Sequence, residues 1–137
     1  MARILIAEDD DSVRAFVTSA LKMKGYEVVV AEDGGLAAEI MDAEKGRFDL
    51  LLSDIKMPIM DGIALALTVA ASFPEVIIVL MTGFADQREQ AHGLHELIYD
   101  VIVKPFTLAD LLAKVDDALA GRPIEIVSQG RQAQDPS

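Results

Sequence analysis

Residues 50–54 read Leu-Leu-Leu-Ser-Asp, a short apolar run that ends in a carboxylate. Three other apolar runs have the same form: residues 3–7 before Glu8-Asp9-Asp10, residues 77–81 before Thr82-Gly83, and residues 101–103 before Lys104-Pro105. Helix-length segments separate these runs, which is typical of buried strands in a parallel sheet. In such sheets the functional side chains lie just beyond the carboxyl ends of the strands. We therefore expect carboxylates, a hydroxyl and an ammonium at one edge of one sheet.

The composition excludes several classes of protein. An apolar fraction of 52% over 137 residues supports a folded core, and no apolar stretch is long enough to span a membrane. A net charge of −11 argues against binding to a nucleic-acid backbone, and the absence of cysteine excludes disulfides and thiolate metal sites. The strand pattern that begins at Arg3 leaves no room for a signal peptide, so we expect a cytoplasmic protein.

Strands and helices are expected to alternate five times along the chain. The expected strands are 3–7, 27–31, 48–53, 77–81 and 99–103. The expected helices are one over about 13–21 that ends near Gly25, then 36–43, 63–72, 86–95 and 108–119, the last with Thr107 as its N-cap. This order predicts an α/β fold, a flavodoxin-like (βα)5 doubly wound parallel sheet with strand order 2-1-3-4-5.

The chain changes character near its end. Residues 122–137 are rich in Gln, Pro, Gly and Ser, apart from the apolar residues around Ile124-Glu125-Ile126-Val127. We therefore expect a domain over residues 1–120 and a disordered tail over residues 121–137. The apolar patch could dock loosely on the domain or on a partner, or it could do neither.

The acidic residues that follow the first and third strands predict a metal site. Strand order 2-1-3 brings Glu8 and Asp9 beside Asp54, where like charges repel unless a cation compensates them. Mg²⁺, which prefers oxygen ligands, is the natural cation. The alternatives are that Asp54 caps a local turn and that residues 8–12 form an acidic start to a helix. We expect Asp10, Asp11 and Ser12 to have only that capping role.

A carboxylate beside Mg²⁺ can act as a nucleophile toward phosphorus and form an aspartyl phosphate. Asp54 is the candidate nucleophile, Lys104 the candidate positive charge for the phosphoryl oxygens, and Thr82 the candidate hydroxyl donor. Taken singly, Lys104 is typical of a surface lysine and Thr82 of a turn residue. Their shared position at carboxyl ends of neighbouring expected strands favours the functional interpretation.

The set Glu8-Asp9, Asp54, Thr82 and Lys104-Pro105-Phe106, with the loop Met57-Pro58-Ile59-Met60-Asp61-Gly62, resembles bacterial two-component response-regulator receiver domains of the CheY-like kind. The resemblance covers about residues 2–120. It implies that Asp54 is the phosphoacceptor, charged by a histidine kinase, a histidine phosphotransferase or a small phosphodonor. It also implies that Thr82 and Lys104 contact the phosphoryl group.

The resemblance further implies how the metal is held. Asp9 and Asp54 would bind Mg²⁺ directly, the backbone carbonyl of Lys56 would add a ligand, and Glu8 would act through water. The Lys104–Pro105 peptide is expected to be cis. In this family Lys56 and Phe84 also occupy positions that tune dephosphorylation.

The switch aromatic of this family usually lies three residues before the lysine, where this chain has Val101. Tyr99 lies two residues earlier on the same face of the strand, and Phe84 lies two residues after Thr82. Either aromatic could take over the role, and Phe84 could equally be a loop residue that packs locally.

The resemblance favours a phosphorylation switch that is not an enzyme, a stand-alone receiver that is a monomer or a weak dimer. A downstream protein would contact the face formed by residues 86–95, 99–103 and 107–119, with His92, His95 and Tyr99 as candidate contacts. The chain also resembles receivers of the CpdR type, which act as adaptors for a ClpX-dependent protease.

Two alternatives use the same acids. One is a receiver fragment of a longer DNA-binding regulator. The other is a magnesium-dependent phosphatase with an aspartyl nucleophile, which would normally carry a second Asp at the position of Lys56.

Overall fold

The structure, a computed structural model, describes residues 2–83, 93–94 and 96–121. Its five parallel strands have the order β2-β1-β3-β4-β5, as the sequence predicted. The strands are β1 (Arg3–Ala7), β2 (Glu27–Ala31), β3 (Leu50–Asp54), β4 (Ile77–Thr82) and β5 (Asp100–Val103). The helices are α1 (Asp11–Met23), α2 (Gly34–Ala43), α3 (Gly62–Ser72) and α5 (Leu108–Leu119). The flavodoxin-like, doubly wound α/β fold is confirmed.

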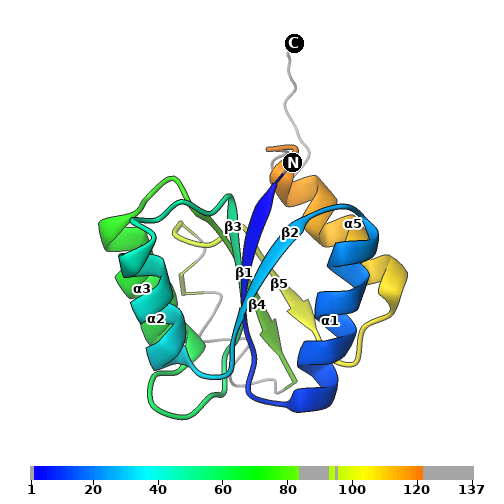
Figure 1. The fold of residues 1–137 in the computed structure, drawn as a ribbon, viewed down its shortest axis with the longest axis horizontal. Helices are drawn as coiled ribbons and strands as arrows, with labels where there is room; N and C mark the ends of the chain where they lie inside the picture. The colour runs from blue at the N-terminus through cyan, green and yellow to red at the C-terminus, as the bar shows by residue number, and fades with distance from the viewer. Residues whose placement is uncertain (1, 84–92, 95, 122–137) are drawn as a thin grey trace.

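Helices cover both faces of the sheet (Figure 1), with α2 and α3 on one side and α1 and α5 on the other. Alternate strand residues enter the two apolar layers, because successive side chains of a strand point to opposite faces. Leu5, Leu51 and Leu80 pack with the α2–α3 layer. Ile4 and Leu52 pack with the α1–α5 layer. Burial on both faces explains why these strands are continuous apolar runs.

The ends of several elements differ from those expected. The third strand begins at Leu50, two residues later than expected, and extends through Asp54. The aromatic ring of Phe48 lies 4.5 Å from the guanidinium carbon of Arg3, and the Asp49 carboxylate accepts the Arg3 backbone N–H at 2.7 Å. The Phe48 N–H donates to the Gly46 carbonyl at 2.8 Å, within the turn after α2, and not to a neighbouring strand.

Other differences are small. The fourth strand ends at Thr82 and the fifth begins at Asp100. Asp10 is the N-cap of α1, with its carboxylate accepting the Val13 backbone N–H. The capping box of Thr107 and Asp110 at the start of α5 is confirmed. The helix expected over residues 86–95 lies almost entirely outside the described residues, and so does the expected tail beyond Gly121.

Two glycines expected in loops instead begin helices α2 and α3, and both are sites of close backbone approach. A Cβ on Gly62 would lie 2.1 Å from the Asp54 carbonyl oxygen, and one on Gly34 would lie 1.8 Å from the Met60 carbonyl oxygen. No side chain fits at such distances. The two glycines therefore allow the loop after β3 to pack tightly against both helices.

No helix in the described part of the chain has the length and apolar character needed to cross a membrane.

Tyr26, at the start of β2, joins two distant parts of the chain. Its phenol donates a hydrogen bond to Asp116 of α5, and Lys24 approaches the same carboxylate at 3.1 Å. Burial, together with the hydrogen bond and negative charge of Asp116, raises the pKa of Tyr26 to about 12. The neutral phenol is therefore favoured in the folded state.

This pKa predicts a loss of stability at alkaline pH. Because the pKa in the folded state lies above the unfolded value of about 10, the contribution of Tyr26 is complete below pH 10 and declines as the pH rises toward 12. The chain has two tyrosines, so the Tyr99→Phe variant retains Tyr26 as its only one. Absorbance titration of tyrosinate should give a midpoint near 12 when folded and near 10 in urea. Asp116→Asn should lower the folded midpoint; a folded midpoint near 10 in Tyr99→Phe alone would contradict the contact.

Candidate functional site

The candidate site lies at the carboxyl edge of the sheet. Parallel register aligns the strand ends there, with Ala7 opposite Ser53 and Thr82 opposite Val103. Four chemically reactive residues stand at or just beyond these ends: Glu8 after β1, Asp54 in β3, Thr82 in β4 and Lys104 after β5. The fold thus brings residues separated by up to 96 positions to one edge.

A single ammonium group connects two of the carboxylates. Lys104 Nζ lies 3.0 Å from Glu8 Oε1 and 2.9 Å from Asp54 Oδ2. The Glu8 side chain is fully buried, and 9% of the Asp54 side chain is exposed. Buried carboxylates require such partners, because an uncompensated charge in a protein interior is costly. Lys104 therefore ties the loop after β5 to the ends of β1 and β3.

The ionisation of Glu8 and Lys104 reflects this packing. The pKa of Glu8 is raised to about 7. Burial is the largest cause and the charge of Asp54 adds to it, whereas the hydrogen bonds from the Asp10 backbone N–H and from Lys104 act in the opposite direction. For Lys104, partial burial lowers the pKa, but hydrogen bonds to Asp54 and Glu8 outweigh this, so its pKa lies above the usual value. Lys104 is a fixed positive charge at neutral pH.

The carboxylates themselves form a compact cluster. One oxygen from each of Glu8, Asp9 and Asp54 lies within 4.8 Å of the others. Glu8 and Asp54 are buried and Asp9 is exposed, so the cluster opens to solvent on the side of Asp9. All the donors are hard oxygens, and the Lys104 ammonium contacts two of the three acidic groups. This donor set fits Mg²⁺, which takes a few carboxylates and completes its octahedron with water.

The loop after β3 sets the direction of Asp54. The backbone N–H of Ile55 donates to Asp54 Oδ1 at 2.9 Å, and the backbone N–H of Gly62 donates to the Ile55 carbonyl at 2.7 Å. Ile55 and Met57 are buried, whereas Lys56 between them is exposed. The loop thus fixes one oxygen of Asp54 and leaves the other to Lys104.

Thr82 and Lys104 are linked through the backbone. The Lys104 N–H donates to the Thr82 carbonyl at 2.7 Å, and Thr82 is fully buried. The Lys104–Pro105 peptide is cis, as predicted. These features place the start of the β5–α5 loop beside the end of β4.

Of the two aromatic residues that could act as the switch, Tyr99 and Phe84, the structure describes only Tyr99. Val101 is half-buried and lies opposite Leu80 in the sheet, and Tyr99 precedes the strand and donates its N–H to the Ile78 carbonyl at 2.7 Å. Phe84, His92 and His95 lie outside the described residues.

Sequence reasoning missed two contacts here. Glu8 accepts a hydrogen bond from Lys104, a contact that is separate from its expected role toward Mg²⁺ through water. Arg14 donates from Nη1 to the Glu8 carbonyl at 2.9 Å and so anchors the β1–α1 loop. An arginine in the first turns of a helix carries no signal that predicts such a contact.

Comparison with known proteins gives a consistent result. Residues 4–116 match the family model for the response regulator receiver domain. The chain is 40% identical over 119 residues to the response regulator receiver protein CpdR of Brucella abortus, covering 87% of this chain and 98% of that one. It is 30% identical to the transcriptional regulatory protein PrrA of Mycobacterium tuberculosis, covering 96% of this chain and 62% of PrrA.

Among solved structures, the response regulator TrrA of Thermotoga maritima, determined with Mg²⁺ and BeF, superimposes with a TM-score of 0.77 at 28% identity. The match covers 86% of this chain and 99% of TrrA. Family model, sequence relatives and fold all agree, and receiver domains bind Mg²⁺ at an acidic pocket. The chain belongs to the family of two-component response regulator receiver domains.

Proposed function

We propose that this chain is a single-domain response regulator in which Asp54 accepts a phosphoryl group in a Mg²⁺-dependent reaction. The observation that carries the proposal is the convergence of the Lys104 ammonium and two further carboxylates on Asp54. Membership of the receiver family supports it, since receiver domains are in general phosphoryl acceptors without an enzymatic activity of their own. We place the domain at residues 1–120, with residues 121–137 as a disordered tail, in the cytoplasm.

In the proposed reaction, an oxygen of Asp54 forms a bond to phosphorus while the bond between phosphorus and the donor breaks. The donor is the phosphohistidine of a histidine kinase or phosphotransferase, or a small phosphodonor. Lys104 stabilises the charge on the phosphoryl oxygens, and the Thr82 hydroxyl donates a hydrogen bond to them. Bound Mg²⁺ neutralises charge on the acceptor and on the transferring group.

Asp9, Asp54 and the backbone carbonyl of Lys56 are the proposed direct ligands. Glu8 is assigned a role through water, and its hydrogen bonds support this. Lys104 occupies one of its carboxylate oxygens, and the Asp10 backbone N–H occupies the other at 3.0 Å. Asp9 is the exposed member of the cluster and is open to an incoming ion.

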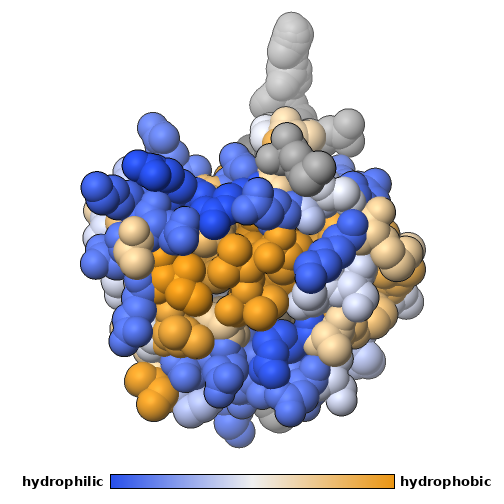
Figure 2. Space-filling model, in the orientation of Figure 1, coloured by the Kyte–Doolittle hydropathy of each residue, from blue (hydrophilic) through white to orange (hydrophobic). Residues whose placement is uncertain are grey.

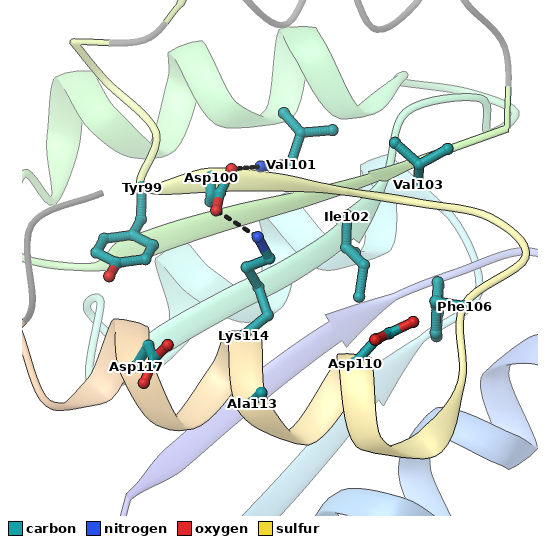
Figure 3. Close-up of a pocket in the computed structure, with 10 residues that line it drawn as sticks. All are labelled: Tyr99, Asp100, Val101, Ile102, Val103, Phe106, Asp110, Ala113, Lys114 and Asp117. Carbon is teal, nitrogen blue, oxygen red and sulfur yellow. Dashed lines mark hydrogen bonds and ion pairs between the residues drawn. The ribbon is translucent and has the colours of Figure 1, made fainter. Parts of the chain in front are cut away.

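The output surface is proposed on β5 and α5, together with residues 86–95. A pocket between β5 and α5 has a volume of about 540 Å³. Figure 3 shows Lys114 of α5 reaching Asp100 of β5 across it, at 2.6 Å, with Asp110 and Asp117 on the same helix. Lys104 directly follows β5, so a new bond from Lys104 to the phosphoryl group would shift the element that forms this pocket.

A downstream protein that prefers one of the two arrangements would detect the phosphorylated state. We propose a protease adaptor role, in line with the CpdR-type resemblance and with the 40% identity to that relative. Because the chain covers 62% of PrrA, a receiver unit of a longer regulator is the second candidate.

Phosphorylation at Asp54 is tested by incubating the protein with a small phosphodonor and Mg²⁺ and measuring the intact mass. We expect a single phosphoryl adduct that is absent in Asp54→Asn, because the amide is a poor nucleophile. Continuous release of phosphate over many turnovers without an adduct would favour the phosphatase alternative instead.

The metal assignment predicts that Asp9→Asn raises the Mg²⁺ concentration needed for half-maximal phosphorylation about tenfold, since loss of one charged ligand costs roughly 1.4 kcal/mol or more. The matched control is Asp10→Asn, which removes a neighbouring charge but keeps an effective N-cap. Phosphorylation of the wild-type chain and of each variant is measured over a series of Mg²⁺ concentrations. Equal requirements in both variants would contradict the assignment of Asp9.

The bridge formed by Lys104 predicts a coupling energy with Asp54. At pH 8, above the pKa of about 7 of Glu8, Lys104→Met should lower the free energy of unfolding by about 3 kcal/mol, because it leaves two buried carboxylates without their partner. In an Asp54→Asn background the loss should be smaller by about 1 kcal/mol or more.

Urea unfolding of the four proteins measures the cycle. Lys22→Met, at an exposed lysine of α1, is the control and should change stability by less than about 0.5 kcal/mol. Additive losses in the double variant would show that Lys104 and Asp54 do not interact.

A further inference from the structure

The outer edge of β2 presents backbone groups with no partner strand in the described sheet, because β2 is the first strand of the order β2-β1-β3-β4-β5. The Glu27 N–H donates to the Ala2 carbonyl at 3.0 Å, and the Ala31 carbonyl accepts from Glu8 at 3.1 Å. Glu27 and Ala31 therefore direct their backbone N–H and C=O groups toward β1. Since backbone direction alternates along a strand, Val28 and Val30 direct their N–H and C=O groups outward.

This edge is also apolar. The strand reads Glu-Val-Val-Val-Ala, and its one charged residue, Glu27, is held by Arg3 at 2.9 Å. The exposed fraction of Val30 is 42%, and that of Leu36, in the adjoining helix α2, is 38%. Figure 2 shows an apolar patch in the middle of the face on which Figure 1 places β2. Edge strands are usually protected by charges, proline or bulges. Residues 28–30 are all valine and therefore supply neither a charge nor a proline.

We propose that this edge binds a second copy of the chain, with the two β2 strands antiparallel. In the proposed register Val28 of each copy lies opposite Val30 of the other, and the two Val29 residues meet at the two-fold axis. Both valines of each pair direct their N–H and C=O groups toward the other copy, so each pair exchanges two backbone hydrogen bonds. The same surface serves on both copies, as a closed two-fold dimer requires.

The charges that flank the strand select the antiparallel orientation. Lys22 and Lys24 precede β2, and Glu32 and Asp33 follow it. Antiparallel pairing brings the basic end of one copy to the acidic end of the other. Parallel pairing would bring like charges together, which is unfavourable. Lys24 keeps 44% of its side chain exposed beside Asp116 and is accessible for this contact.

The dimer would leave the receiver chemistry free. β2 and β5 lie at opposite edges of the sheet, so the β5–α5 pocket is not covered. The strands of the two copies would run in opposite directions, so the two candidate sites, each at the carboxyl ends of its own strands, would point in opposite directions. Each copy carries a net charge of −11, so repulsion opposes association and added salt should strengthen it.

Sedimentation velocity of the full chain over a range of protein concentrations, in low and in moderate salt, tests the proposal. We expect a monomer–dimer equilibrium that shifts toward dimer with both variables. Val30→Lys should raise the dissociation constant at least tenfold, because it places a charge at the paired edge. Leu67→Lys introduces the same charge at an exposed apolar residue of α3 and should leave the dissociation constant unchanged.

Amide hydrogen exchange supplies an independent measurement. Protection of the Val28 and Val30 amides should rise with protein concentration, whereas that of Val29, which already faces β1, should not. A wild-type chain that stays monomeric, or a dimer that Val30→Lys does not weaken, would overturn the proposal. So would a chain ending at Gly121 that dimerises when the full chain does not, because the chain's own residues 122–137 would then cover the edge.

Discussion

One ammonium group between two buried carboxylates holds the functional edge of this protein together. Lys104 contacts both Glu8 and Asp54, which come from different strands and would otherwise repel each other. The parallel sheet brings these groups together, because the carboxyl ends of all its strands lie at one edge. Three clustered carboxylates and one ammonium leave an excess of negative charge at the site, and this excess favours the binding of a metal ion.

Specific backbone contacts hold the loop after β3 in place. Gly62 and Gly34 permit backbone contacts that no other residue allows, and they fix the loop that follows Asp54. The Ile55 N–H then orients one oxygen of Asp54, while Lys104 holds the other. A change of charge at Asp54 therefore acts first on Lys104, which leads through a cis peptide into the β5–α5 segment. This connection gives the proposed switch its physical path to the output surface.

Much of the fold could be predicted because its central strands are buried on both faces, so β1 and β4 stand out as apolar runs. Prediction was wrong at the ends of some elements. The strand was expected to begin at Phe48, but the N–H of that residue donates to the Gly46 carbonyl and not to a neighbouring strand. Gly34 was taken for a loop residue because its close neighbour, Met60, is 26 positions away. At the site, spacing predicted which residues converge, but not that Glu8 would bond Lys104 directly.

In the proposed reaction the carboxylate of residue 54, and no other, receives the phosphoryl group. Borohydride reduces an acyl phosphate of aspartate to homoserine and so marks the modified residue permanently. The protein is treated with a small phosphodonor and Mg²⁺, reduced, digested and sequenced by mass spectrometry. The structure predicts homoserine at position 54 alone. Homoserine at position 9, or at acidic residues scattered over the surface, would contradict the assignment of this site.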